Sequence, residues 1–278
     1  MLPNNPLTQY FRQPAIYIRL PSEGKFYPPG TLNLPANGEL PVLPMTSVDE
    51  ITYRTPDALF NGTATVNVIR SCVPAIRDPW VMPSSDIDAV LVGIRIASYG
   101  HAMDLSVVCP SCGTDDDISV DLRLVNDRLK IGDYTRAKII DDLEFWFQPI
   151  NYKSVNDNNQ LQMQQQQAMR VVDSDVDDTV KMEQMSRSMM LLNETTIKTI
   201  AQSIAAIKTP SAMVTETEYI LDFLRNCESK IFNQLRDHVI ELKQQSDVQP
   251  LELTCKECSH QYKQPFTLDL SNFFDNAS

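Results

Sequence analysis

Two similar cysteine-containing segments constrain the fold of this chain more strongly than any other feature of its sequence. Residues 104–122 read DLSVVCPSCGTDDDISVDL, and residues 250–270 read PLELTCKECSHQYKQPFTLDL. In each segment an alternating run, a Cys-x-x-Cys motif, turn residues and a second alternating run follow one another. Alternation of apolar and polar residues is typical of a half-buried strand. Each segment is therefore predicted to form a β-hairpin that carries two cysteines at its tip.

The cysteines of the two hairpins match the ligand set of a structural metal site: Cys109, Cys112, Cys255 and Cys258. A spacing of two residues lets both thiolates of one motif face the same ion, and two such motifs complete a tetrahedral shell of four sulfurs. We predict one shared zinc ion, with an iron–sulfur cluster as the alternative cofactor. Two disulfides or four unliganded thiols are the other interpretations of the same residues.

The N-terminal sequence bears on the choice between metal ligands and disulfides. MLPNNPLTQYFRQP has no basic start followed by an apolar stretch, so a secretory signal is not expected. No apolar run approaches the roughly 18–20 residues that span a bilayer. We therefore expect the protein to be made in a reducing cytoplasm, where paired cysteines serve as metal ligands more often than as disulfides.

The distance between the two motifs is unusual, because 142 residues lie between Cys112 and Cys255. The two halves of an ordinary zinc ribbon are separated by about 15–20 residues. Within this long segment, residues 154–245 are rich in glutamine and carry two series of apolar residues at spacings of three and four, which predict three or four inserted amphipathic helices. The series are Ile197, Ile200, Ile204 and Ile207, and then Leu224, Cys227, Ile231, Leu235, Val239 and Leu242.

Residues 1–45 contain nine prolines and are predicted to form an extended arm. Proline neither donates a hydrogen bond to a strand ladder nor continues a helix. An alternating run at 16–20 predicts one short strand in the arm. We expect the arm to lie on its own core or on a neighbouring subunit, and to be weakly protected from hydrogen exchange in the isolated protein.

Helices and further strands are predicted after the arm. One helix begins at Thr55 and ends at Asn61-Gly62, and a second contains Val66 and Ile69 and ends before Pro74. A third helix extends from Ser85 to Tyr99-Gly100. Strands are predicted at 104–108, 118–124, 143–149, 251–254 and 266–270.

These patterns predict an α+β fold with a small antiparallel four-cysteine zinc-ribbon-like β part. The chain is divided into a proline-rich arm at 1–45, an N-terminal α+β part with the first hairpin at 46–150, an inserted helical region at 151–248, and the second hairpin at 249–278.

The charge and the missing motifs exclude several classes of function. The chain has 36 Asp and Glu against 24 Lys and Arg, with a formal net charge of -12. Nucleic acids and anionic membranes attract clustered basic residues, so we expect neither as a partner, and a nucleic-acid-binding zinc ribbon is a weaker alternative. The sequence has no GxSxG, HExxH, GxGxxG or P-loop motif. A non-enzymatic protein is expected, and a thioredoxin-like redox role is disfavoured because neither Cys-x-x-Cys motif opens a helix.

The remaining cysteines and the histidines have structural interpretations. Cys72 and Cys227 fall in apolar helical registers and are predicted to be core residues. His260 follows the second motif closely enough to replace a cysteine ligand, but with four cysteines present we expect it on the surface. His101 and His238 have no partner motif.

Two further runs are interpreted without a ligand. Asp115–Asp117 lack the EF-hand pattern and are expected at a solvated hairpin tip. The methionines at positions 182, 185, 189 and 190 predict an adaptable packing face, for a core or for a partner helix.

Long sequence blocks then resemble one protein family. The blocks are LPSEGKFYPPG, LPVLPMTSVDEITYRTPDALFNG, VIRSCVPAIRDP and IDAVLVGIRIASYGHAMD, which leads into CPSC. They are similar to the baseplate hub or hub-assembly proteins of T-even-like and other contractile-tailed bacteriophages. The resemblance covers residues 16–125 and 249–270, and residues 154–245 do not take part in it.

The resemblance implies a structural, non-enzymatic role in the hub at the tip of the phage tail. It implies other baseplate hub and tail proteins as partners, with self-association left open, and a place in the virion after assembly in the host cytoplasm. An assembly chaperone that leaves the finished particle is the alternative. The paired Cys-x-x-Cys elements of the family match the four hairpin cysteines, and the family supplies no catalytic residue.

Overall fold

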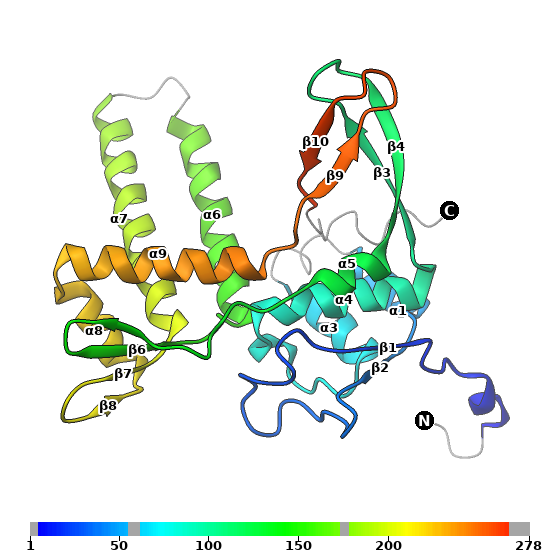
Figure 1. The fold of residues 1–278 in the computed structure, drawn as a ribbon, viewed down its shortest axis with the longest axis horizontal. Helices are drawn as coiled ribbons and strands as arrows, with labels where there is room; N and C mark the ends of the chain where they lie inside the picture. Colours follow the sequence, from blue (N-terminus) through cyan, green and yellow to red (C-terminus); the bar gives the residue numbers. More distant parts are fainter. Residues whose placement is uncertain (1–4, 55–61, 173–177, 267–278) are drawn as a thin grey trace. The chain divides into compact units, whose positions relative to one another are not determined.

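The computed structural model describes residues 5–54, 62–172 and 178–266. Within them the chain is a mixed α+β protein with eight α-helices and small antiparallel sheets, which confirms the predicted fold class (Figure 1). The chain forms two compact units. Unit 1 contains residues 1–79, 85–130 and 247–278, and unit 2 contains residues 80–84 and 131–246.

Unit 1 contains the predicted N-terminal helices and both cysteine hairpins. Its elements are η1 (Pro6–Tyr10), β1 (Ile16–Ile18), β2 (Leu40–Val42), α1 (Ser47–Tyr53), α3 (Thr63–Cys72), α4 (Ser84–Tyr99), β3 (Ala102–Val108), β4 (Asp115–Asp121), α5 (Leu122–Arg128), β9 (Leu251–Thr254) and β10 (Gln261–Gln264). A short 3-10 turn, η2 (Pro79–Val81), lies at the boundary of the two units. The helices predicted around Val66 and from Ser85 correspond to α3 and α4, whereas the helix predicted from Thr55 to Asn61 lies outside the described residues.

Part of the proline-rich segment packs into the core of unit 1. Strand β1 pairs antiparallel with β2, with Ile16 opposite Val42 and Ile18 opposite Leu40. Ile18, Leu40 and Val42 are buried. The two strands approach α4 at Gly93, where an added Cβ would lie 2.9 Å from Cγ2 of Ile18. Part of the segment therefore lies on the protein's own core, which was one of the two expected placements. This burial argues against weak protection along the whole of residues 1–45.

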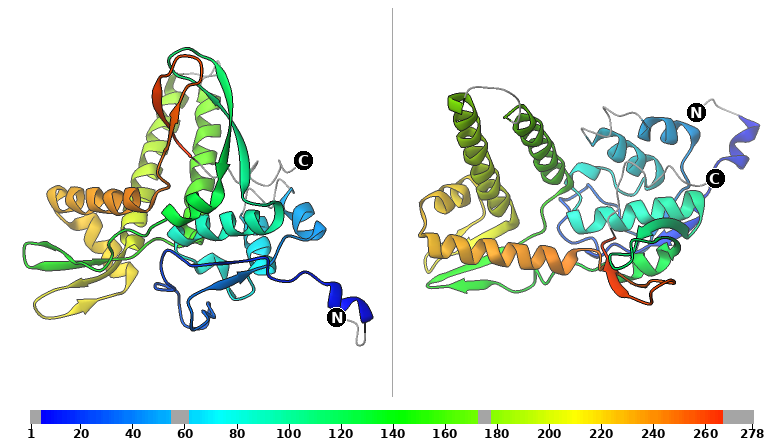
Figure 2. Two further views of the ribbon diagram at one scale, coloured as in Figure 1. Left: turned by 45° about the vertical axis from the view of Figure 1, so that its right-hand side comes forward. Right: turned by 90° about the horizontal axis from the view of Figure 1, so that it is seen from above.

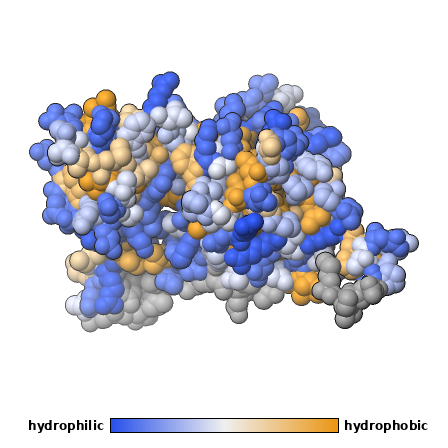
Figure 3. Space-filling model, turned by 90° about the horizontal axis from the view of Figure 1, so that it is seen from below, coloured by the Kyte–Doolittle hydropathy of each residue, from blue (hydrophilic) through white to orange (hydrophobic). Residues whose placement is uncertain are grey.

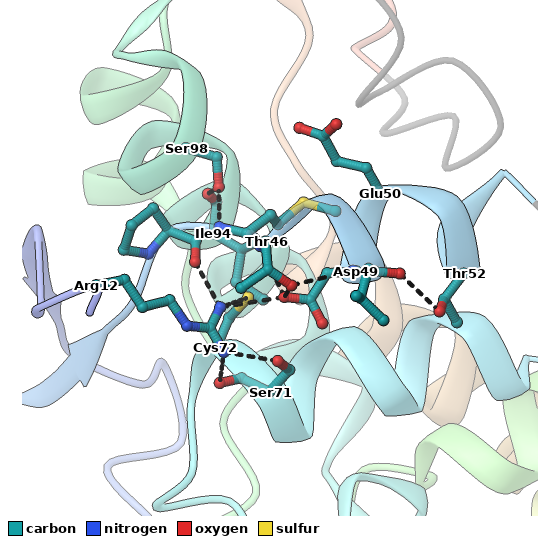
Figure 4. A network of polar contacts seen from close by, with 12 residues as sticks. Arg12, Thr46, Asp49, Glu50, Thr52, Ser71, Cys72, Ile94 and Ser98 are labelled. Atoms are coloured by element: carbon teal, nitrogen blue, oxygen red, sulfur yellow. Dashed lines mark hydrogen bonds and ion pairs between the residues drawn. The ribbon is translucent and has the colours of Figure 1, made fainter. Parts of the chain in front are cut away.

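Arg12 fastens the chain that precedes β1 (Figure 4). Its guanidinium donates hydrogen bonds to the carbonyl oxygen of Pro44, to Asp49 at 3.1 Å, and to both the carbonyl and the hydroxyl of Ser71. Asp49 also closes a capping box with Thr46 at the start of α1. Burial raises the pKa of Asp49. Hydrogen bonds from Thr46 and Ser71 and the charge of Arg12 together lower this pKa by more than burial raises it, so it lies below its usual value.

Unit 2 contains a four-stranded antiparallel sheet and four helices, within the described residues. The strands are β5 (Lys138–Ile140), β6 (Leu143–Phe147), β7 (Ile204–Lys208) and β8 (Met213–Val214), in the order β5-β6-β7-β8. The helices are α6 (Tyr152–Val172), α7 (Asp178–Ser203), α8 (Thr217–Asn226) and α9 (Ser229–Ser246). Phe145 and Phe147 of β6 form one buried cluster with Ile200 of α7, Ile220 of α8 and Leu235 of α9.

Both helical stripes predicted for the insertion are interrupted in the structure. Helix α7 ends at Ser203, and Ile204 and Ile207 lie in β7, paired with β6. Pro210 disfavours a longer helix, while β-branched isoleucines fit a strand beside β6. The second stripe is divided at Cys227, where α8 ends with an extended backbone before α9 begins at Ser229.

Among the described residues, no helix has the length and hydrophobicity needed to cross a membrane.

Candidate metal centre

The first cysteine motif lies at the tip of the β3–β4 ribbon. All seven residues of β3 pair with β4, from Ala102 opposite Asp121 to Val108 opposite Asp115. In the turn, the amide of Cys109 donates to the carbonyl of Thr114 at 3.0 Å, and the amide of Gly113 donates to the carbonyl of Cys109 at 2.9 Å. Gly113 has a φ of 71°, a conformation that glycine adopts without strain. The chain thereby turns sharply beneath the two thiols.

The second motif repeats the same turn at the tip of the β9–β10 ribbon. Its strands pair from Leu251 opposite Gln264 to Thr254 opposite Gln261. The amide of Cys255 donates to the carbonyl of His260, and the amide of Ser259 donates to the carbonyl of Cys255, both at 3.0 Å. Ser259, with a φ of 57°, takes the place of Gly113. The similarity of the two sequence segments thus extends to their backbone hydrogen bonds, which confirms that each segment forms a hairpin with its cysteines at the tip. The returning strand of the second hairpin is β10 at Gln261–Gln264, whereas residues 267–270 of the strand predicted at 266–270 lie outside the described residues.

The two tips bring all four predicted site residues together. The ribbons stand side by side within unit 1 (Figures 1 and 2), and the sulfur atoms of Cys109, Cys112, Cys255 and Cys258 lie within 4.8 Å of one another. Across the ribbons, the sulfurs of Cys109 and Cys258 are 3.7 Å apart and those of Cys112 and Cys255 are 3.6 Å apart.

These distances fit four ligands of one ion. A tetrahedral zinc site with bonds of about 2.3 Å has sulfurs separated by roughly 3.8 Å, whereas the sulfurs of a disulfide are about 2.05 Å apart. Cys109 and Cys255 are buried, while Cys112 and Cys258 are exposed. The cluster is therefore accessible to a metal ion from one side and supported by the ribbons on the other.

The electrostatics of the cluster also favour a cation. Hydrogen bonding with Thr114 lowers the pKa of Cys112 to about 6. For Cys258, a backbone hydrogen bond with His260 acts in the same direction, but burial and the neighbouring thiols raise its pKa to about 12. Thiolates this close repel one another, so full deprotonation requires a positive charge between them. A divalent metal ion would supply that charge.

An ion pair joins the two ribbons beside the sulfurs. Nζ of Lys256 lies 2.6 Å from Oδ1 of Asp116, on the opposite ribbon, and this contact raises the pKa of Lys256. The sequence interpretation treated Asp116 as part of a solvated tip and missed this role. In the sequence, an acidic run follows one cysteine motif and a lysine lies inside the other. These residues indicate an ion pair only when the two hairpin tips are known to meet.

Below the tips the ribbons do not close into one sheet. A cavity of about 600 Å³ lies between them, lined by Ile118 and Val120 of β4, by Leu251 and Leu253 of β9, and by the polar side chains of neighbouring residues. Strands β3 and β4 form one two-stranded sheet, and β9 and β10 form another. Among the described residues, the polar contacts between the two ribbons are those of the sulfurs and of Lys256, and they lie at the tips.

The other two cysteines and His238 lie outside the cluster, whereas His260 contacts it through its backbone. Cys72 is buried, and burial raises its pKa to about 11. Cys227 is half-buried in unit 2, where burial also raises its pKa. His260 is exposed and stacks on Tyr262, and His238 lies edge-on to Phe147. Among the described residues, the four hairpin cysteines are the group found with metal-binding geometry.

Comparison with known proteins supplies the family. A search of curated proteins and a search of solved structures found no match to the chain. A family model described as the T4 bacteriophage base plate protein matches residues 49–275, which include most of the chain and all four cysteines of the cluster. The chain therefore belongs to the T4 bacteriophage base plate protein family.

Proposed function

We propose that this protein is a non-enzymatic structural component of the phage tail baseplate hub, and that one zinc ion bound by its four hairpin cysteines holds its two β-ribbons together. The observation that carries the proposal is the convergence of four thiols, from segments far apart in the sequence, within the part of the chain that matches a baseplate family. Four cysteine ligands leave no open coordination position, which is typical of structural rather than catalytic zinc.

The ion would act as a crosslink in unit 1. Cys109 and Cys112 would hold it from the β3–β4 ribbon, and Cys255 and Cys258 from the β9–β10 ribbon. Below the tips a cavity lies between the ribbons, so the ion would join them at the end where the two turns meet. The ion pair between Lys256 and Asp116 would be a second link between the tips, beside the metal ion. A fixed pair of ribbons offers neighbouring subunits a surface of defined shape.

Exposed apolar residues support the inference that the protein docks on other baseplate hub and tail proteins. The 3-10 helix η1 contains no buried residue and exposes Leu7 and Tyr10, and Phe11 follows directly. On α1, Val48 and Ile51 are also exposed. Hydrophobic residues appear in several patches on the face drawn in Figure 3. Apolar patches with polar rims are common at protein–protein interfaces.

Quantitative mass spectrometry of purified virions tests the proposed role. We expect the protein at a fixed, small number of copies in intact particles and in isolated baseplates, with zinc that copurifies in proportion. A protein required for baseplate formation but missing from finished particles would be an assembly chaperone, and the structural role would be wrong. A major capsid protein with a known copy number serves as the internal standard.

A further inference from the structure

Helix α7 of unit 2 presents an apolar stripe to solvent. Met182, Met185, Met189 and Leu192 follow one another at spacings of three, four and three residues and therefore lie on one side of the helix. They are 77%, 48%, 56% and 50% exposed. In a helix that belongs to a globular unit, such a stripe normally faces the interior. The buried cluster of unit 2 begins further along α7, at Ile200.

A line of polar residues of α7 runs beside the stripe and includes Thr199, which contacts α6. Thr199 accepts a hydrogen bond of 3.0 Å from Asn158 of α6. Three further polar residues lie on the same side of α7 as Thr199, at spacings of seven and four residues: Lys181, Ser188 and Thr195. They are partly buried although they are polar. These polar residues are thus partly buried, while the apolar residues of the stripe beside them are exposed.

The charges of this stretch differ from those of the whole chain. Residues 178–198 contain three acidic and three basic side chains, whereas the chain has a net charge of -12. The positions that border the stripe are Lys181, Ser186, Ser188 and Asn193. Two copies brought together along this stripe would place no like charges against each other, because a lysine on one copy meets serine or asparagine on the other. Elsewhere the acidic surface opposes self-association.

We propose that the stripe Met182–Met185–Met189–Leu192 is a self-association surface, which pairs with the same stripe of a second copy of this chain. Spacings of three and four make the stripe complementary to itself, because the side chains of one helix enter the spaces between those of the other. Methionine adapts its shape readily to such a contact. The inference uses unit 2 alone and depends neither on the metal site nor on the baseplate role.

Sedimentation of the full-length protein tests the proposal, with a matched pair of variants. The native chain should change from monomer to dimer between about 1 and 100 µM, the range expected for an interface with few anchoring side chains. Replacing Met185 and Met189 together by Glu should weaken the dimer at least about tenfold. The control is Met190→Glu: Met190 is 70% exposed but lies about 100° around the helix from Met189, so the dimer should persist. Both variants change exposed residues and should keep their helical circular dichroism.

Methionine oxidation gives a second readout of the same surface. Peroxide should oxidise Met185 and Met189 more slowly at concentrations where the dimer forms, while the rate at Met190 stays constant. A native chain that remains monomeric throughout this range would overturn the proposal and leave the stripe to a helix of another protein. A dimer that survives the double substitution, or that protects Met190 equally, would overturn it too, because association would then use another surface.

Discussion

Asp86 shows how one residue couples the stability of unit 1 to pH. Its carboxylate is buried and accepts hydrogen bonds from the amide and hydroxyl of Ser22 and from the hydroxyl of Tyr27. Burial raises the pKa of Asp86 to about 6, although the hydrogen bonds from Ser22 and Tyr27 oppose that change. Because the folded-state pKa lies above the unfolded value, this residue contributes stability that is present in full below about pH 4 and is lost as pH rises through 6.

Asp86→Asn should therefore change the pH dependence of unfolding. In the native protein, protonation of Asp86 stabilises the fold as pH falls from 7 towards 4, by an amount on the order of 2 kcal/mol. The asparagine variant has no such gain. Urea unfolding at several pH values checks this through the difference in unfolding free energy between the two proteins. Asp88, whose pKa is also raised to about 6 by burial and by Asp247, titrates in both proteins. A difference that does not vary with pH would contradict the assignment.

Gly93 is required by the close approach of β1 to α4. Since a Cβ would lie 2.9 Å from Cγ2 of Ile18, Gly93→Val should lower the free energy of unfolding by about 2 kcal/mol through overpacking. Chemical denaturation measures the loss. Ile18→Ala removes the obstructing methyl group, so the double variant should lose less than the sum of the two single losses. Additive losses would mean that the two side chains do not collide.

At the scale of elements, Arg12 fastens the N-terminal segment to α1 and α3. Arg12→Ala should cost about 2 kcal/mol, because Asp49 and several backbone groups lose a charged hydrogen-bond donor in a partly buried place. Arg19→Ala is the matched control. The Arg19–Glu39 pair is exposed, with side chains 74% and 38% accessible against 23% and 10% for Arg12–Asp49, and should contribute less than about 0.5 kcal/mol. Equal losses in thermal or urea unfolding would refute the distinction.

The sequence predicted those elements whose signals are local. Alternation and turn residues located both cysteine hairpins, and helical periodicity located α3 and α4. It was misleading at Ile204 and Ile207, because spacings of three and four do not reveal that β6 requires a neighbouring strand. Cys227 likewise continues an apolar series through a break between α8 and α9. The spacing of apolar residues alone cannot distinguish a continuous helix from a strand or a helix break when pairing with a distant strand decides the structure.

The sequence predicted that these four cysteines lie together, but it did not predict what surrounds them. A repeated Cys-x-x-Cys motif specifies its own ligands, since four sulfurs complete one shell. The contact of Lys256 with Asp116 joins residues far apart in sequence and depends on how the two tips meet. The packing of Ile18 and Val42 against Gly93 also joins residues far apart in sequence, so it was not predicted. The proline-rich composition of this segment suggested an extended arm instead.

Removing one ligand should separate the ribbons without unfolding the helices. Cys255→Ser leaves three thiolates. Structural zinc sites bind the ion with a free energy of roughly 10 kcal/mol or more, and the loss of one ligand should lower the zinc affinity by several orders of magnitude. The variant should retain most of its helical circular dichroism, lose zinc on dialysis, and show faster hydrogen exchange in β9 and β10. Cys227→Ser, at a cysteine outside the cluster, should retain the metal. Equal zinc content and exchange in the two variants would disprove the crosslink.

At the scale of the whole molecule, unit 1 is assembled from chain segments on both sides of unit 2. The metal would join positions 109 and 255, which are 146 residues apart in the sequence, and so link the segments of unit 1 that precede and follow the insertion along the chain. A crosslink between distant positions limits the freedom of the unfolded chain more than one between near positions.

X-ray absorption of the purified, reduced protein tests the shared metal site most directly. The account predicts close to one zinc per chain, surrounded by four sulfur atoms at about 2.3 Å and by no nitrogen or oxygen ligand. An absorber shell of fewer than four sulfurs, or a protein that acquires no stoichiometric metal when reduced and supplied with zinc, would contradict it.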